Sequence, residues 1–386
     1  MHTWLLPEYI EDVLPIEAAR IERMRRQILD LFRVHGYQYV MPPLLEYLES
    51  LLTGTGHDMD LQTFKLVDQL SGRLIGLRAD ITPQVARIDA HLLNRQGVTR
   101  LCYAGSVLHT VPAGLTRTRE PLQIGAELYG HAGLESDVEI MQLMLQALML
   151  AGVATVQLDT GHVGIFGSLM RHANVPADLE SELFRVLQAK DIPTLQTLAQ
   201  SLDKQTRSAL IQLPELYGGA EVLDQAQQSL PAYPEIYQAL ADLRSIAAQL
   251  HSSVPDLCFD LAELRGYHYH SGVVFATYAQ GWSNAVALGG RYDEVGKTFG
   301  RARPATGFSM DLRAISAVLP PVAMTPGILA PYLNDAALQE KIAALRRVGE
   351  MVVINLPGHE TGAAELNCDR LLGLHNGEWQ VNRIDS

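Results

Sequence analysis

The spacing of apolar residues predicts several helices and short strands. Over residues 16–35, apolar side chains between Ile21 and Phe32 recur at steps of three and four, which places them on one face of an α-helix that would end near Gly36. Residues 136–152 show a second helical period. Between residues 63 and 130 the apolar runs are short and separated by turn residues, a pattern typical of an antiparallel sheet.

The pattern changes between residues 163 and 251, where short helical periods punctuated by Pro and Gly predict a helical insertion. Strands return after it, and a Pro-rich stretch at residues 319–327 indicates a linker. Residues 328–386 then predict one β-α-β unit with a thin remainder. We therefore expect a first domain over residues 1–318, the linker, and a short C-terminal α/β remnant.

Composition and charge narrow the classes of protein. With 386 residues, of which 47% are hydrophobic, the chain is long enough for two or three domains with sizeable cores. Its net charge of −13 disfavours broad, sequence-independent binding to a phosphate backbone. The three cysteines, Cys102, Cys258 and Cys368, lie far apart and form no CxxC pair, so we expect neither a disulfide framework nor a thiolate zinc site.

The sequence pattern indicates neither a membrane span nor a signal peptide. No apolar run reaches the roughly 18–20 residues of a membrane span. The first fifteen residues carry acidic side chains and lack the cationic region of a signal peptide. We expect a cytoplasmic protein that has no membrane partner.

Several motifs occur in an order that resembles the class II histidyl-tRNA synthetases. They are Pro42-Pro43, RADITPQVAR (78–87), LRGYHYHSGVVF (264–275), GGRYD (289–293) and PATGFSMDL (304–312). The similarity covers roughly residues 5–318, with Tyr9 where a glycine is usual. It implies an α+β fold: a class II aminoacyl-tRNA synthetase-like antiparallel sheet flanked by helices, with the helical insertion and a small C-terminal α/β segment.

The positions that bind ATP in those synthetases differ in this chain. Leu108 and Thr110 stand where the second class-defining motif has an Arg and a Glu. In the third motif, Asp311 replaces a glycine and Ala314 replaces the Arg that binds the γ-phosphate, while Arg313 lies one position earlier, about 100° round a helix. An Arg placed on transition-state charge is worth about 10³-fold or more in rate. We therefore expect ATP-dependent adenylation to be nearly abolished.

The C-terminal segment indicates a second loss. The synthetases carry a larger anticodon-binding domain, whereas residues 320–386 number only 67 and hold five Lys and Arg against eight Asp and Glu. A short acidic segment is a poor reader of RNA, because nucleic-acid affinity comes largely from clustered cations. We expect no tRNA partner.

The resemblance also implies a pocket that binds an amino acid. It implies that Asp80 and Thr82 hold a substrate α-amino group, and that Gln123 and Glu127 meet the carboxylate side and the imidazole of a histidine-like ligand. Carboxylates suit this task, because an ammonium group and an imidazole N–H both need acceptors. The ordinary alternatives are a turn at Asp80 and Thr82 and a solvated strand face at Gln123 and Glu127.

Three further positions complete the implied pocket. Arg265 matches the Arg that the synthetases place near the carboxylate and the α-phosphate, although it could simply pair with Glu263 on the surface. Tyr269 and His270 replace a Tyr-Tyr pair. GGRYD has a glycine pair but lacks the G-K-[ST] of a phosphate loop, so a turn with close backbone approach is its ordinary interpretation.

Two other groups of residues were weighed. Arg117 and Arg119 are either a residual anion contact or solvated charges. His268 and His270 share one face of a predicted strand, but no third ligand has diagnostic spacing. We expect no metal and no cofactor.

A chain that keeps this domain but lacks the ATP arginines and the anticodon domain is similar to the regulatory subunits of ATP phosphoribosyltransferase. The resemblance implies a subunit without catalytic residues that activates a short-form catalytic subunit in histidine biosynthesis and takes part in feedback inhibition by histidine. It also implies dimerisation through the strand near Tyr39 and Pro43. Two alternatives stay open: a divergent, active histidyl-tRNA synthetase, and an orphan amino-acid-binding paralogue that regulates another enzyme.

Overall fold

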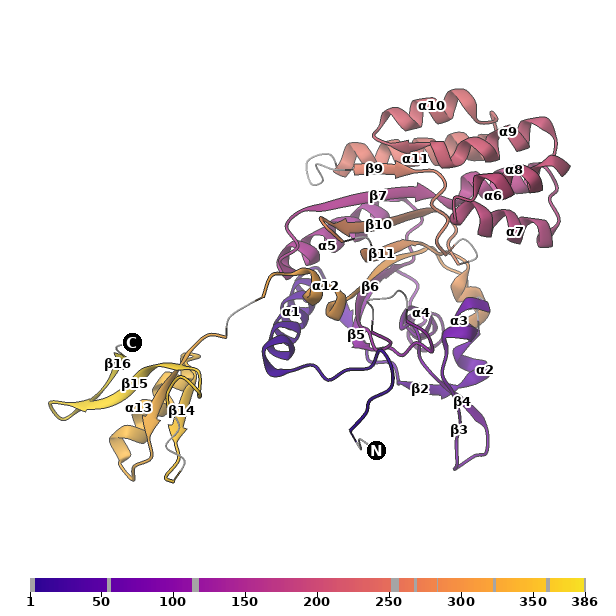
Figure 1. Cartoon of the computed structure of the whole chain (residues 1–386). Helices are drawn as coiled ribbons and strands as arrows, with labels where there is room; N and C mark the ends of the chain where they lie inside the picture. Colours follow the sequence, from indigo (N-terminus) through magenta and orange to yellow (C-terminus); the bar gives the residue numbers. More distant parts are fainter. Residues whose placement is uncertain are drawn as a thin grey trace. The chain divides into compact units, whose positions relative to one another are not determined.

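The chain folds into two compact units, Met1–Pro320 and Pro321–Ser386 (Figure 1). The computed structural model describes residues 4–53, 57–112, 118–250, 257–266, 269–282, 284–321, 324–358 and 362–384. The boundary between the units falls inside the Pro-rich stretch at residues 319–327.

The first unit is built on a nine-stranded sheet. In spatial order its strands are β1 (Gln38–Tyr39), β5 (Thr99–Ser106), β6 (Leu122–Tyr129), β12 (Ala305–Asp311), β11 (Ala285–Arg291), β10 (Val273–Ala279), β7 (Val156–His162), β9 (Leu257–Asp260) and β8 (Tyr217–Gly218). The six strands from β5 to β7 pair antiparallel. The short apolar runs predicted this for β5 and β6, and the resemblance implied it for the whole sheet. Two pairs outside them, β1–β5 and β7–β9, are parallel, so the whole sheet is mixed.

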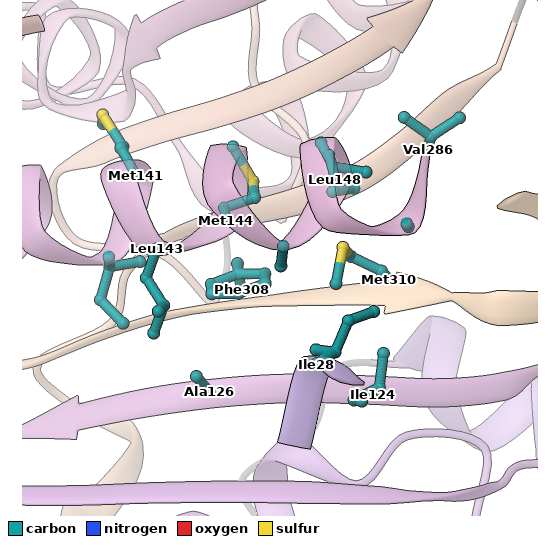
Figure 2. Close-up of a cluster of buried hydrophobic side chains, with 14 of the residues drawn as sticks. Ile28, Ile124, Ala126, Met141, Leu143, Met144, Leu148, Val286, Phe308 and Met310 are labelled. Carbon is teal, nitrogen blue, oxygen red and sulfur yellow. The ribbon is translucent and has the colours of Figure 1, made fainter. Parts of the chain in front are cut away.

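One face of this sheet packs against three helices, α1 (Pro15–Val34), α5 (Leu134–Ala151) and α12 (Leu312–Val318). The predicted stripe of α1 is buried, from Ile21 to Phe32, and Gly36 follows the helix with a φ of 85°. Figure 2 shows Met144 and Leu148 of α5 beside Phe308 of β12, all within one buried apolar cluster. The burial of these side chains fixes the helices to the sheet.

The helical insertion consists of α6 (Val163–His172), α7 (Ala177–Gln188), α8 (Ile192–Leu198), α9 (Lys204–Gln212), α10 (Glu221–Ser229) and α11 (Pro234–Leu250), with short 3₁₀ turns η2 (Ala199–Ser201) and η3 (Leu213–Glu215). Figure 1 shows these helices gathered beside β7 and β9. They bury a hydrophobic core of their own, while Ile246 and Leu250 of α11 belong to the core of the sheet. The insertion is thus anchored to the sheet by α11.

A second, three-stranded sheet lies in the N-terminal part of the same unit. Its antiparallel order is β2 (Leu45–Tyr47), β4 (Leu74–Leu77) and β3 (Lys65–Val67). The short helices of this part and of the later loop are α2 (Leu48–Leu51), α3 (His57–Gln62), α4 (Thr82–Arg87), the π-helical turn η1 (Ile88–Leu93) and the 3₁₀ turn η4 (Val295–Phe299). Because β1 ends before Pro42-Pro43, the two prolines separate the two sheets.

The second unit is a four-stranded sheet with one helix. Its strand order is β14 (Val352–Asn355), β13 (Gly327–Pro331), β15 (Cys368–His375) and β16 (Glu378–Arg383), and α13 (Ala336–Arg347) joins β13 to β14. The β13–α13–β14 segment is the predicted β-α-β unit. The remainder, expected to be thin, forms an antiparallel hairpin whose turn holds Asn376 and Gly377 at positive φ, as a type I′ turn requires.

Two buried ion pairs join separate elements of the first unit, η1 to the loop before β12 and α5 to β11. Arg303 Nη1 lies 3.0 Å from both carboxylate oxygens of Asp89, and both side chains are buried. Arg291 lies 2.8 Å from Asp137 and also donates to the carbonyl oxygen of Gly133. Removal of one partner leaves the other charge uncompensated in the interior, so such pairs matter more than exposed ones.

We predict that Arg303→Met lowers the free energy of unfolding of the first unit by about 3–5 kcal/mol, because Asp89 would be left as an unpaired buried charge. The matched control is Arg33→Met, whose partner Asp30 is exposed, and its cost should stay below about 1 kcal/mol. Urea unfolding followed by circular dichroism measures both values. Equal losses for the two variants would contradict the prediction.

Candidate functional site

The face of the central sheet opposite the helices carries the candidate site. In β6, Ile124 and Ala126 join the buried cluster under the helices, so the alternating residues Gln123 and Glu127 point to the other side. The alternative of a solvated strand face does not apply to Glu127, which is only 1% exposed.

A cavity of about 150 Å³ opens on this face. It is lined by Asp80, Thr82, Glu127, Tyr269, His270, Leu288, Gly289, Tyr292, Gly307, Phe308 and Ser309. Five of the seven pocket residues expected from the sequence therefore surround one cavity. Its size is well below the roughly 300–1,000 Å³ of pockets for drug-sized ligands, so it suits a smaller molecule.

Glu127 is the polar centre of the cavity. The hydroxyl groups of Thr82 and Tyr103 each lie 3.1 Å from its Oε1 and 2.9 Å from one another, while the hydroxyl of Tyr292 hydrogen-bonds its Oε2. Burial raises the pKa of Glu127 to about 8; the negative charge of Asp80 adds to this rise, and the hydroxyl contacts oppose it. These surroundings favour the protonated form of Glu127 at neutral pH.

Asp80 forms the turn that the ordinary interpretation expects, and the turn also lines the cavity. Its Oδ1 accepts hydrogen bonds from the backbone N–H of Thr82, at 3.1 Å, and from Gln123 Nε2, at 2.7 Å. Gln123 Oε1 in turn accepts from the N–H of Ile81, at 2.9 Å. Gln123, which is not among the lining residues, therefore holds the Asp80 turn in position.

Glycine is required where strands β11 and β12 pass the carboxylate. A Cβ atom on Gly307 would collide with Glu127, and one on Gly289 would collide with the carbonyl oxygen of Gly307 and the ring of Phe275. Gly289 and Gly290 are part of β11. The prediction of a turn at GGRYD is therefore wrong, although the close approach of backbones that we expected there is present.

Aromatic rings close one side of the cavity. The ring centroid of Tyr269 lies 5.0 Å from that of Tyr292 and 5.3 Å from that of His270. His270 Nδ1 donates to the carbonyl oxygen of Arg291, at 3.2 Å, and burial lowers the pKa of His270 to about 4. The hydroxyl of Tyr269 is buried and has no hydrogen-bond partner among the described residues, so it is a donor that a ligand could satisfy.

Arg265 lies beside this cavity, not in its wall. Its guanidinium forms an ion pair with Glu263, with Nη2 2.8 Å from Oε2, and donates to the hydroxyl of Tyr278. The pairing with Glu263 is thus the contact that the ordinary interpretation expects. Arg265 nevertheless lines an adjoining cavity of about 230 Å³, which shares His270, Leu288 and Gly289 with the first.

The residues aligned with the ATP-binding positions make ordinary structural contacts. The N–H of Leu108 donates to the carbonyl oxygen of Arg78, and Thr110 donates through its hydroxyl to Leu61. Asp311 caps α12 by accepting from the N–H of Arg313, at 3.0 Å. Ala314 is buried.

Arg119 contacts the N-terminal segment. Its Nε donates to the carbonyl oxygen of His109 and its backbone N–H to that of Tyr9, whose φ of 61° is the conformation that favours the glycine usual there. Arg117 and His268 lie outside the described residues. Within the described part of the chain, no cluster of three or more His, Cys, Asp or Glu residues could hold a metal ion.

Sequence reasoning missed Tyr103 and Tyr292, which bind the Glu127 carboxyl group. Tyr292 belongs to the GGRYD motif, so its position in that motif was an available signal. Tyr103 lies in an ordinary apolar strand and carries no such signal.

No helix of the described residues is long and apolar enough to cross a bilayer.

Comparison with known proteins adds a family to this geometry. The sequence model of the histidyl-tRNA synthetase family matches residues 9–315, and that of the ATP phosphoribosyltransferase subunit HisZ C-terminal domain matches residues 325–382. ATP phosphoribosyltransferase regulatory subunits from Nitrosospira multiformis and Methylobacillus flagellatus are 60% and 58% identical, each over 99% of this chain and 98% of the relative.

Solved structures agree with this assignment. A Bacillus halodurans protein described as an ATP phosphoribosyltransferase regulatory subunit/histidyl-tRNA synthetase has a TM-score of 0.82 and 28% identity, over 95% of this chain and 96% of that one. The histidyl-tRNA synthetase of a Nostoc species, at 19% identity over 99% and 97% of the two chains, has a TM-score of 0.79 and shares the fold. The chain therefore belongs to the family of ATP phosphoribosyltransferase regulatory subunits, with a histidyl-tRNA synthetase-like first unit.

Proposed function

We propose that this chain is a regulatory subunit without catalytic activity of its own. A short-form catalytic subunit of ATP phosphoribosyltransferase needs it for activity. Histidine acts as feedback inhibitor by binding in the Glu127 cavity. The observation that carries the proposal is the buried carboxyl group of Glu127, at the centre of an amino-acid-sized cavity in a fold whose ATP-binding positions hold other residues.

The polar groups of the cavity suit histidine. Glu127 would accept from the imidazole N–H, and Asp80, whose Oδ1 is already fixed by Gln123, would accept from the α-ammonium. The carboxylate of the ligand needs a cation, and Arg265 in the adjoining cavity can supply it once its guanidinium leaves Glu263. On binding, the carboxylate of the ligand would therefore replace Glu263 as the ion-pair partner of Arg265.

The positions aligned with the ATP arginines support the proposed lack of catalysis. Leu108 and Ala314 offer no charge to a triphosphate, and the Asp311 carboxylate that caps α12 would repel one. Arg313 has its guanidinium 3.4 Å from Glu120.

A short segment connects the cavity to Pro42 and Pro43, which gives ligand binding a route to the rest of an assembly. Arg78 Nη1 donates to the carbonyl oxygen of Pro42, at 2.8 Å, and Gln84 Nε2 to that of Pro43, at 2.9 Å. Between them in sequence lie Asp80 and Thr82, which line the cavity. A ligand that shifts this segment would therefore act on the prolines through two direct hydrogen bonds, and histidine could bias the assembly between two states.

The surface near these prolines supports a homodimer. Exposed apolar side chains gather there: Tyr39, Met41, Leu44, Leu45 and Tyr47. An open hollow of about 510 Å³ lies beside them, lined in part by Pro43, Leu45 and Tyr47. Large exposed apolar surfaces mark interaction sites, and a second copy of the same strand would cover this one.

The decisive test compares two activities. We predict that the purified chain gives only background histidine-dependent exchange between ATP and pyrophosphate, and that its addition raises the rate of a short-form catalytic subunit in a histidine-sensitive manner. Exchange above background would support the divergent synthetase instead. An unchanged rate and unchanged inhibition would contradict the regulatory role and leave the orphan paralogue.

We predict that Glu127→Gln weakens histidine binding by about 10- to 150-fold, because a hydrogen bond to a charged group is worth about 1.5–3 kcal/mol. Since the pKa of Glu127 is raised to about 8, the protonated carboxyl group is favoured at pH 7, and it must lose its proton before it can accept from the ligand as a charged carboxylate. Binding should therefore release up to one proton, and affinity should rise as the pH increases from 6 to 8.

Isothermal titration calorimetry in buffers of different ionisation enthalpy measures both the affinity and the released proton. The exposed Glu340→Gln is the matched control and should leave both unchanged. Histidine binding of the same strength, with the same proton release, in Glu127→Gln would show that the ligand binds elsewhere.

For the homodimer, we predict that Met41→Glu shifts the chain toward the monomer, because a charge would be buried without a partner at the interface. Met41 is 80% exposed in the single chain, and Met149 of α5, at 65%, offers the matched control Met149→Glu. Sedimentation velocity over a concentration series measures the equilibrium. Equal behaviour of the two variants would place the self-contact on another surface.

A further inference from the structure

We propose that a second cavity, separate from the Glu127 cavity, binds a small organic cation such as an amine or amidine with a flat apolar body. The cavity has a volume of about 520 Å³ and is lined by Thr155, Gln157, Asp159, Tyr217, Tyr278, Ala279, Gln280, Gly281 and Trp282. None of these residues lines the two cavities described above.

Strand register places the cavity on the face of the central sheet that carries the histidine-like pocket. Gln157 of β7 lies opposite Tyr278 of β10, and Asp159 lies opposite Ala276, which lines the adjoining cavity at Arg265. Leu158, between the two polar residues, belongs to the buried cluster under the helices. Gln157 and Asp159 therefore point together to the opposite side.

Asp159 is a buried carboxylate that lacks a cationic partner among the described residues. It is only 8% exposed, and its Oδ1 accepts from Gln157 Nε2, at 2.7 Å. The two nearby cations are engaged elsewhere: Lys190 lies 2.9 Å from Asp260, and Arg265 lies 2.8 Å from Glu263. A buried charge in this situation is costly, and a bound cation would compensate it.

The charges around Asp159 select a cation over an anion. Burial raises the pKa of Asp159; the hydrogen bond from Gln157 and the charge of Arg265 oppose the rise, and the carboxylates of Asp260 and Glu263 add to it. Because Lys190 and Arg265 are each paired with one of these two carboxylates, the charge of Asp159 is the one left without an ion pair among these described residues. Gln157 Nε2 donates to Asp159 and also to the hydroxyl of Tyr217, at 2.8 Å, which fixes the carboxylate in the cavity wall. A phosphate or carboxylate ligand would be repelled here.

Aromatic rings form the remaining walls. The ring of Tyr217 already attracts Lys190, whose Nζ lies 5.3 Å from the ring centroid, and the ring of Tyr278 has Arg265 Cζ at 5.7 Å. Trp282 adds an indole whose Nε1 is buried without a hydrogen-bond partner among the described residues. Aromatic faces beside a carboxylate are the usual surroundings of bound organic cations.

The size and the ligand set favour a small molecule over a metal ion. A volume of about 520 Å³ lies within the roughly 300–1,000 Å³ of small-molecule sites. The lining includes one carboxylate and no His or Cys, which is too few donors for a metal centre. A cation with a planar body would place its charge at Asp159 and its apolar surface against the tyrosine rings.

The test uses benzamidine as the cation and neutral benzamide, which has nearly the same shape, as the control ligand. Isothermal titration calorimetry on the full chain should show saturable binding of benzamidine and at least tenfold weaker binding of benzamide. The near-isosteric Asp159→Asn should weaken benzamidine binding at least tenfold. Tyr217→Leu, at a half-exposed residue, should weaken it about threefold or more, as loss of a cation–π contact predicts.

Two further measurements separate this proposal from the others. Glu127→Gln should leave benzamidine binding unchanged, so a failure of the histidine proposal and a failure of this one are distinguishable. Absence of saturable binding, equal binding of the two ligands, or an unchanged affinity in Asp159→Asn at unchanged melting temperature would overturn the cation site. Asp159→Asn should also retain its affinity for the catalytic subunit. If Asp159→Asn loses this affinity and the unsubstituted chain does not bind benzamidine, the cavity is a contact for a protein partner instead.

Discussion

The alternation of side chains along the central strands is the constraint on which the rest of the first unit depends. Each strand from β5 to β7 contributes one set of residues to the apolar cluster under α1, α5 and α12 and the alternate set to the opposite face, which carries the cavities. A shift in register of one residue would turn Glu127 into the core and Ile124 out of it. The apolar packing in Figure 2 therefore also fixes the positions of the polar groups on the reverse side.

The polar face is a row of neighbouring cavities. Glu127, Thr82 and Tyr292 line one, Arg265 and Glu263 line the next, and Asp159 lines a third. Arg265 lies between the outer two, because its guanidinium reaches the hydroxyl of Tyr278, which lines the third cavity. Arg265 therefore contacts the walls of two neighbouring cavities at once.

The sequence predicted the elements that depend on local periodicity and missed features that depend on distant pairing. The stripe of α1 follows from its spacing of three and four residues, and Gln123 and Glu127 were placed on one strand face by alternation alone. The parallel pairs β1–β5 and β7–β9 join segments far apart in the chain, so no local pattern specifies them. The β15–β16 hairpin was predictable from Asn376-Gly377, whereas the role of Tyr103 was not, because a pocket tyrosine and a core tyrosine occupy the same kind of strand position.

The cap at Asp311 joins two elements that are distant in sequence. Its carboxylate accepts from the N–H groups of Arg313 and Leu122, so it secures both the first turn of α12 and the start of β6. A glycine at this position would remove both bonds, so one substitution would loosen a helix end and a strand end that lie 189 residues apart in the sequence. The two elements are therefore coupled through a single side chain, and the stability of the β6 start depends on the residue at which β12 passes directly into α12.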